Sequence, residues 1–199
     1  MWRGSRRATL AVLLFALGLL AGQAAEATLI GQSVSVTLGD GGSLLHDDVV
    51  TVGSGVELSA GDGSDIGTVL LPKETIDIGA TSIALVLEQG VPGGGTGYPS
   101  NTAYVFTNLI FSDATTVITG VSVSTTNLSG LGTGDVTFTD TSLRVPIDKL
   151  TIGDIPGVDF GSVAIDIQFA IVPEPATALL LSLGLIGLAG ARARPRAAR

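Results

Sequence analysis

The 199-residue sequence contains no cysteine, and it has one histidine, one methionine and one tryptophan. The absence of cysteine excludes disulfides, thiolate nucleophiles, iron–sulfur clusters and cysteine-ligated zinc. The single histidine, His46, leaves no imidazole cluster for a zinc site and no partnered serine-hydrolase base, and we expect it to be a solvated residue entering a strand. Packing alone must therefore stabilise the folded part of the chain.

Basic residues are scarce between the two ends of the chain. Residues 28–171 hold sixteen of the eighteen acids, since only Glu26 and Glu174 lie outside, but they hold three bases, which gives a formal charge of −13. Those bases are Lys73, Arg144 and Lys149. Such an acidic stretch argues against nucleic-acid binding and favours solubility. Aromatic residues are also few, which argues against a glycosidase with an aromatic-lined sugar cleft.

The first 27 residues have the pattern of a secretory signal peptide. Three arginines precede an apolar segment at 10–21, and small residues follow it. The triplet Ala25-Glu26-Ala27 offers an A-x-A site for signal peptidase, with cleavage after Ala24 or Ala25 as an open alternative. This pattern predicts export through the general secretion translocon, because the residues after Arg6-Arg7 lack the twin-arginine consensus.

The last 28 residues combine three physically different pieces. Val172 leads into Pro173-Glu174-Pro175, where the two prolines end any strand and leave the glutamate extended and accessible. An apolar run from Ala176 to Ala191 follows, slightly shorter than the roughly 17–25 residues of a comfortable spanning helix. The chain closes with four arginines, which resist crossing a bilayer and should stay cytoplasmic: Arg192, Arg194, Arg196 and Arg199.

This arrangement closely resembles the PEP-CTERM sorting signal of Gram-negative envelope proteins. The resemblance rests on Val172, Pro173-Glu174-Pro175, the Leu/Gly-rich run and the terminal arginines. It implies an inner-membrane precursor that a membrane-embedded exosortase cuts at or near the Pro-Glu-Pro triplet. It also implies delivery to the cell surface or extracellular matrix, often beside exopolysaccharide in a biofilm. An ordinary C-terminal anchor with coincidental prolines is the alternative.

Between these ends the sequence predicts an all-β domain, residues 28–171. Apolar residues alternate with polar ones at Val34, Val36 and Leu38, and again from Val163 to Ile171. Short β-forming segments separated by Gly, Asp and Ser turns predict an antiparallel β-sandwich of eight to ten strands. No fixed-period repeat supports the alternative, a β-solenoid. The expected strands between these two cover residues 48–52, 56–58, 68–71, 75–78, 82–88, 102–111, 117–126, 136–139 and 142–145.

Three of these segments carry more specific expectations. Ser82–Glu88 is apolar enough to be buried on both sides, and Gly120 marks a bulge in the strand at 117–126. Asp140-Thr141 should turn a hairpin between two strands. The connector from Gln89 to Ser100 has so many glycines and prolines that we expect a surface loop that does not pack.

The acidic loop residues offer candidate sites in the domain. Asp62 and Asp65, in the segment Gly61–Asp65, are possible calcium ligands, which Asp40 or Asp47 could join, although Asp and Gly in such a loop also simply make turns. Asp47 and Asp48 should point to opposite faces of an extended strand and so form no acid–base pair. Tyr98 is the one loop aromatic placed for sugar stacking.

The sequence therefore favours a non-enzymatic exported envelope or matrix protein with no cofactor. Its expected partners are signal peptidase, the translocon, exosortase, the inner membrane in passing, and exopolysaccharide. A surface-displayed calcium- or glycan-binding module is the first alternative, and a hydrolase is the second.

Overall fold

The computed structural model describes residues 27–40, 43–91, 94–112, 115–153 and 155–172, together with Leu183. Within them the chain forms twelve strands and one short 3₁₀ helix, η1 (Ile66–Thr68), and every strand pairing is antiparallel. The prediction of an all-β, antiparallel domain is confirmed. The strand number exceeds the expected eight to ten because three of the strands have two residues each. We call residues 27–172 the two-sheet domain.

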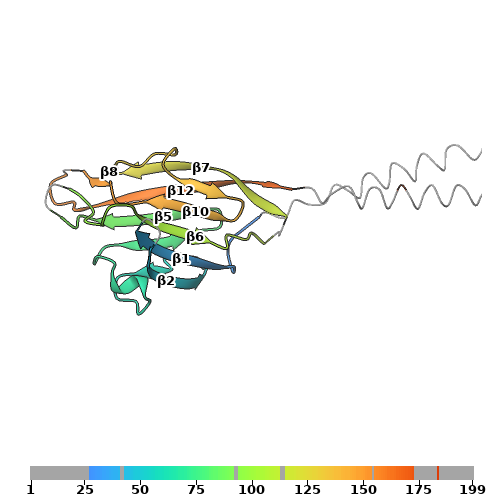
Figure 1. The fold of residues 1–199 in the computed structure, drawn as a ribbon, viewed down its shortest axis with the longest axis horizontal. Coiled ribbons are helices and arrows are strands. Elements are labelled where there is room, and N and C mark those ends of the chain that lie inside the picture. The colour runs from blue at the N-terminus through green and yellow to red at the C-terminus, as the bar shows by residue number, and fades with distance from the viewer. Residues whose placement is uncertain are drawn as a thin grey trace, which may run out of the picture.

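Two five-stranded sheets make up most of this domain (Figure 1). The first sheet has, in spatial order, β2 (Ser43–Thr51), β1 (Ser33–Asp40), β6 (Thr102–Thr107), β10 (Ser142–Pro146) and β9 (Thr137–Thr139). The second has β3 (Leu58–Ser59), β4 (Thr75–Ile78), β5 (Ser82–Glu88), β12 (Phe160–Ile171) and β7 (Thr116–Thr126). A small third sheet pairs β11 (Thr151–Ile152) with β8 (Leu128–Ser129).

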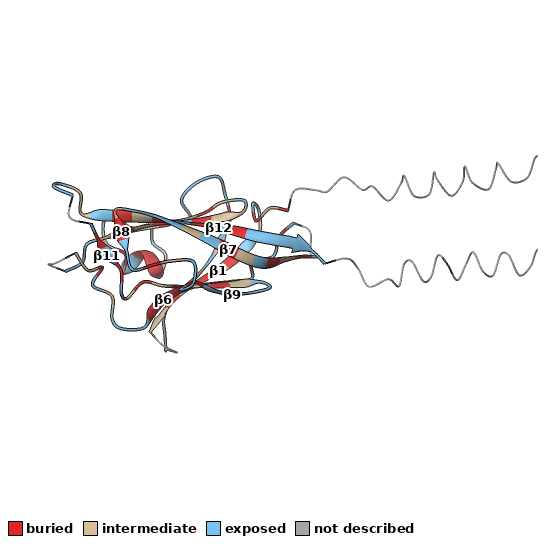
Figure 2. Cartoon of the chain, turned by 90° about the horizontal axis from the view of Figure 1, so that it is seen from above, coloured by how far each residue is buried: buried red, intermediate tan, exposed pale blue. Residues whose placement is uncertain are grey.

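One hydrophobic cluster joins the buried faces of the two large sheets. Val34, Val36 and Leu38 of β1 contribute to it, because the period of two places all three on one face of the strand. Val163, Ile165 and Ile167 contribute from β12 in the same way, whereas the last residues of that strand are exposed (Figure 2). The alternation read from the sequence thus locates the buried face of β1 and of the first part of β12. It is wrong for Phe169 and Ile171, which it placed on the same face but which are 38% and 49% exposed.

Several expected strands have different bounds or are absent. Residues 68–71, which we expected to be a strand, complete the turn of η1 instead, where Val69 and Leu70 both donate to the carbonyl of Ile66. The strand at 102–111 ends at Thr107, because Asn108 takes a left-handed conformation with φ 62°. β2 begins at Ser43, five residues before the expected start.

Burial corrects two further expectations. β5 alternates between buried and more exposed positions, with Ala84 exposed, so it is buried on one side and not on both. The connector after β5 packs against the domain, since Thr96 is buried and donates to the carbonyl of Ile147. The hairpin of β9 and β10 is confirmed, with Ser142 opposite Thr139. The bulge near Gly120 is also confirmed, since Gln168 lies opposite Gly120 and Phe169 lies opposite Ile118.

Candidate functional site

The last strand, β12, carries the chain out of the domain towards the predicted sorting segment. Up to Asp166 the strand lies between β5 and β7, but from Phe169 to Ile171 it pairs with β7 alone. Val172 then continues the ladder, since its N–H donates to the carbonyl oxygen of Thr115 over 2.8 Å. Val172 is nevertheless 49% exposed. Hydrogen-bonded structure therefore reaches the residue immediately before Pro173.

The first residues of the domain lie at this same end. The carbonyl oxygen of Thr28 accepts a hydrogen bond from the N–H of Ser112 over 2.9 Å, three residues before the partner of Val172. In Figure 1 the blue start of the chain and the red end of β12 accordingly meet at one end of the two sheets. A chain that enters and leaves at one end can be held against a single surface by either terminus.

Residues 172–194 match the family model of the PEP-CTERM protein-sorting motif. The chain carries a PEP-CTERM sorting motif. The resemblance drawn from the sequence is thereby confirmed, and the motif marks the chain as an exosortase substrate with an exported, membrane-anchored precursor of the Gram-negative type. Comparison with curated proteins and with solved structures found no match.

Of the PEP-CTERM motif, Val172 belongs to the described two-sheet domain. Pro173, Glu174 and Pro175, the four arginines and the expected spanning run lie outside the described residues, apart from Leu183. In the described part of the chain, no helix is long and apolar enough to cross a membrane. The roles of Arg192, Arg194, Arg196 and Arg199 in orientation stay predictions.

The expected signal-peptidase site straddles the start of the domain. Ala25 lies outside the described residues, but Ala27 is 6% exposed and belongs to the hydrophobic cluster. Leu29, two residues later, is fully buried, and its N–H donates to Ala80. Burial of Ala27 favours cleavage before this residue, after Ala24 or Ala25.

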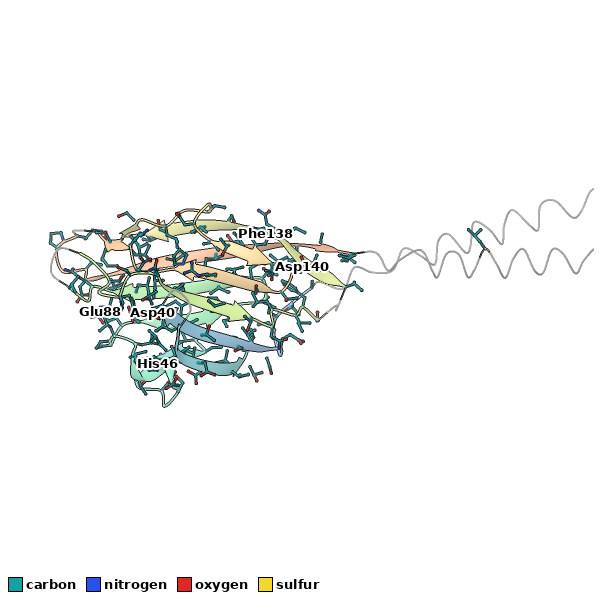
Figure 3. All side chains as sticks on the ribbon, viewed as in Figure 1. Asp40, His46, Glu88, Phe138 and Asp140 are labelled. Atoms are coloured by element: carbon teal, nitrogen blue, oxygen red, sulfur yellow. The ribbon has the colours of Figure 1, made fainter. Side chains whose placement is uncertain are left out.

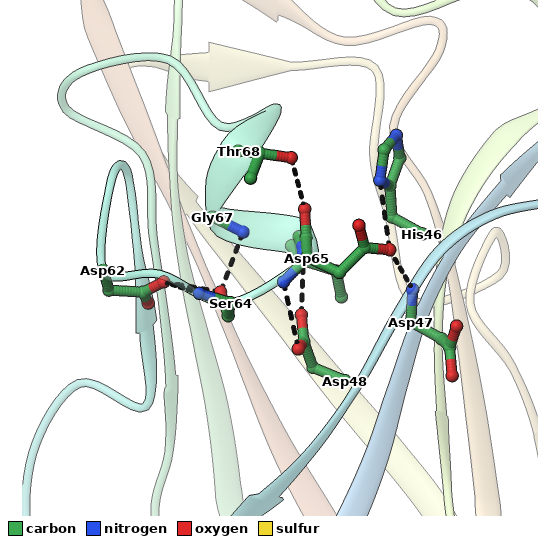
Figure 4. A network of polar contacts seen from close by, with 9 residues as sticks. His46, Asp47, Asp48, Asp62, Ser64, Asp65, Gly67 and Thr68 are labelled. Carbon is green, nitrogen blue, oxygen red and sulfur yellow. Dashed lines mark hydrogen bonds and ion pairs between the residues drawn. The ribbon is translucent and has the colours of Figure 1, made fainter.

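The calcium candidates lie in a hydrogen-bonded turn beside β2 (Figure 4). The carboxylate of Asp62 accepts from the N–H groups of Ser59 and Ser64 and from the Ser64 hydroxyl, so it binds its own loop. Asp65 faces β2, where its Oδ2 accepts from the N–H of Asp47 over 3.1 Å. The two carboxylates thus serve different backbone groups, and among the described residues no three acidic or histidine side chains are grouped so as to hold a metal ion.

Asp48 completes this turn from the neighbouring strand. Its two carboxylate oxygens accept from the N–H groups of Asp65 and Ile66 over 3.1 and 2.7 Å, where η1 begins. Asp47 points to the other side of β2 (Figure 4), as an extended strand predicts for neighbours. Asp48 therefore fixes the loop, whereas the Asp47 side chain is directed away from it.

His46 lies within β2, not before it, and it is partly buried. Its Nδ1 lies 3.2 Å from Oδ2 of Asp65 but is not aligned for a hydrogen bond, so the contact is electrostatic when the ring is protonated. The imidazole, with the N–H of Asp47, lowers the pKa of Asp65. Burial alone would raise the pKa of Asp62, but the hydrogen bonds from Ser64 and Ser59 together lower it. Both carboxylates are held as anions in structural roles.

A buried polar cluster that the sequence did not reveal links the connector after β5 to the core. Glu74 is 1% exposed, and its carboxylate accepts from the N–H groups of Leu71 and Glu88 and, over 2.6 Å, from the Tyr98 hydroxyl. The Tyr98 hydroxyl also lies 3.4 Å from that of Tyr104. Burial raises the pKa of Glu74 and of both tyrosines. Tyr98 is thus turned inward, and its expected role as an exposed sugar-stacking residue is wrong.

A shallow cavity of about 470 Å³ opens at the opposite end of the domain from Val172. Figure 3 places Glu88, which immediately precedes the cavity residue Gln89, at that far end. Close to the cavity, Lys73 pairs with Asp159 and lies 5.9 Å above the ring of Phe160. The contact with Asp159 raises the pKa of Lys73 and lowers that of Asp159. The cavity is lined by Gln89, Gly94, Ile152, Gly153, Ile155, Pro156, Gly157, Val158 and Asp159.

Proposed function

We propose that this chain is a non-enzymatic protein of the cell envelope or extracellular matrix, delivered by exosortase and associated with exopolysaccharide in a biofilm. The observation that carries the proposal is the PEP-CTERM motif, which begins at the residue where the hydrogen-bonded domain ends. In this account residues 1–27 are the signal peptide, residues 28–171 are a β-sandwich cargo and residues 172–199 are the sorting signal. Burial of Ala27 adjusts the first boundary by two or three residues.

Each part of the sorting signal has a separate physical task. Exosortase would read Pro173-Glu174-Pro175, because the prolines keep this triplet extended and outside any strand. The apolar run 176–191 would hold the precursor in the inner membrane, and the arginines would keep its end cytoplasmic. Export by the translocon and signal peptidase would free the other end. The position of both domain ends on one side of the sheets supports a cargo held against that membrane.

The engagement of the polar residues supports a structural role for the domain. The carboxylates of Asp48, Asp62 and Asp65 accept hydrogen bonds from backbone N–H groups. The buried Glu74 carboxylate accepts hydrogen bonds from backbone N–H groups and from the Tyr98 hydroxyl. Groups committed in this way stabilise the fold and are not arranged to meet a substrate.

The test compares three strains: the exosortase-bearing host, its exosortase deletion and its exopolysaccharide deletion. We expect the processed domain in the matrix fraction of the first strain, the precursor in the inner membrane of the second, and the processed domain released to the medium in the third. Equal matrix retention with and without exopolysaccharide would overturn the association but leave sorting in place. Normal processing without exosortase would overturn the sorting.

A glycan-binding module is a second candidate, favoured by the cavity at the far end of the domain. Its lining includes Gln89 and Asp159 beside apolar residues, a combination suited to a sugar ring with hydroxyls. The Gln89 amide nitrogen donates to the carbonyl of Val91 and the Asp159 carboxylate pairs with Lys73, so a sugar would bind through the remaining oxygen atoms of these two side chains. Titration of the processed domain with oligosaccharides from the host polysaccharide would show saturable binding that Gln89→Ala weakens. Binding that is unchanged by Gln89→Ala would remove this candidate.

A further inference from the structure

We propose that the end of the two-sheet domain from which the PEP-CTERM motif emerges docks onto the outer surface of the inner membrane through an uncharged apolar rim. The inference rests on the proposed membrane-held precursor and adds an interaction surface to it. The rim consists of five large apolar residues, each between 38% and 49% exposed: Ile30, Ile110, Phe169, Ile171 and Val172.

Hydrogen bonds and ring contacts bring these residues to one end of the domain. The backbones of Thr28 and Ser112 are hydrogen-bonded. The segment that carries Ile30 therefore lies beside the segment that carries Ile110. Phe169 contacts the buried ring of Phe111 with centroids 5.0 Å apart, which links the end of β12 to the Ile110 segment. In Figure 2 the exposed end of β12 projects beyond the body of the two sheets. The rim residues therefore lie on segments beside the point where the chain leaves the domain.

The rim also differs in charge from the rest of the domain. The segments 28–32, 108–112, 115–118 and 168–172 contain no charged residue, although the domain between residues 28 and 171 carries sixteen acids. Asp113 lies between two of these segments and outside the described residues. Two charged residues lie at the margin of the rim, Asp140 and Glu57. The carbonyl oxygen of Asp140 accepts from the N–H of Ile118. The carboxylate of Glu57 accepts from the N–H groups of Gly53 and Ile78. Apart from Asp113 and Glu174, which lie outside the described residues, these segments of an acidic domain carry no charge that anionic lipid would repel.

The short stretch of chain between the domain and the apolar run indicates that the rim contacts the bilayer. Four residue steps separate Val172 from Ala176, where the apolar run begins, and they span at most about 14 Å when fully extended. The polar layer on each side of a bilayer is about 5–8 Å thick, given a hydrocarbon core of about 30 Å within about 40–45 Å. Val172 is thus held within about 6–9 Å of the outer edge of the headgroup layer. At that distance the rim can reach the bilayer, where Phe and branched apolar side chains gain from burial.

The experiment uses the full chain, Met1 to Arg199, in phosphatidylcholine vesicles that carry brominated acyl chains. In one variant Trp2→Phe and Ile110→Trp place the single tryptophan in the rim, 66 residues before the apolar run. The control combines Trp2→Phe with Leu45→Trp, because Leu45 is 43% exposed and Ile110 is 40% exposed. Leu45 precedes His46, which Figure 3 shows at the edge of the domain, away from the end where the chain leaves it.

We expect blue-shifted and bromine-quenched emission from the tryptophan at 110, and unquenched emission from the tryptophan at 45. Adding Ile171→Asp should abolish the quenching at 110, whereas Ile155→Asp, at a residue of similar exposure in the far loop, should not. Flotation separates the two possible failures. Equal, unquenched emission from both probes in floating vesicles would overturn the docking and leave the anchor intact. A chain that does not float would overturn the anchor and the docking together.

Discussion

The backbone N–H of Val172 donates to the carbonyl oxygen of Thr115 over 2.8 Å, across the last rung of the β12–β7 ladder. The next residue, Pro173, begins the Pro-Glu-Pro triplet of the matched sorting motif. The described domain therefore reaches the residue immediately before this triplet. Exosortase would meet its recognition triplet directly beside a folded domain.

Replacement of Pro173, Glu174 and Pro175 by alanine should stop processing and leave the precursor in the inner membrane. The alanines remove the extended, strand-breaking conformation that presents the cleavage site. Membrane fractionation with detection of the precursor and product sizes checks this expectation. Pro156→Ala, at an exposed proline in the far loop, is the matched control and should be processed normally. Normal surface delivery of the triple variant would contradict the assigned recognition triplet.

The neighbours Asp47 and Asp48 provide a matched pair for the turn beside β2. Asp48→Ala should lower the free energy of unfolding by about 1–3 kcal/mol, because it leaves two backbone N–H groups at the start of η1 without their acceptor. Asp47→Ala should change it by about 0.5 kcal/mol or less, since that side chain is exposed. Urea denaturation of the processed domain measures both. Equal effects would mean that Asp48 does not hold the turn.

Tyr98→Phe should destabilise the domain by about 1.5–3 kcal/mol, the usual contribution of a hydrogen bond to a charged group. The variant removes the hydroxyl donor of the buried Glu74 carboxylate, and the loss should raise the pKa of Glu74 further above its ordinary range. Tyr104→Phe is the control, because its hydroxyl makes one long contact of 3.4 Å with Tyr98. Chemical denaturation near neutral pH should rank Tyr98→Phe as clearly the more damaging change.

Acidification should weaken the domain through Asp62, Asp65 and Asp159. The pKa of each is lowered in the folded state, so each contributes stability above the unfolded value of 3.8, and this contribution is lost as the pH falls below it. Glu74 acts in the opposite sense, because its pKa is raised and its ionisation opposes folding as the pH rises past 4.5. Urea midpoints measured from neutral pH down to about pH 3 should fall, and less steeply in Asp65→Asn. A midpoint that rises on acidification would show that Glu74 outweighs the three aspartates.

The sequence predicted the parts of the fold that depend on local alternation. β1, β4 and β12 have a period of two over at least four residues, so a single strand already reveals its buried face. The sorting motif could also be predicted from the sequence, since it is a linear arrangement of prolines, apolar residues and arginines. These features need no information about distant partners.

Features that depend on partners far along the chain were missed. β2 starts early because it pairs with β1 and supports the 62–68 turn, although His46-Asp47-Asp48 looks like a loop in isolation. Tyr98 turns inward because Glu74, 24 residues earlier, offers a buried acceptor. Residues 68–71 read as a β-forming run, but the hydrogen bonds to Ile66 favour a turn there. No local pattern encodes these contacts.

The intact mass of the protein recovered from the surface of an exosortase-bearing host tests the account most directly. We predict a mass that lacks the signal peptide but keeps Ala27, and that ends at or near Pro173-Glu174-Pro175 without the apolar run and its four arginines. A surface protein whose mass still includes residues 176–199 would contradict the account.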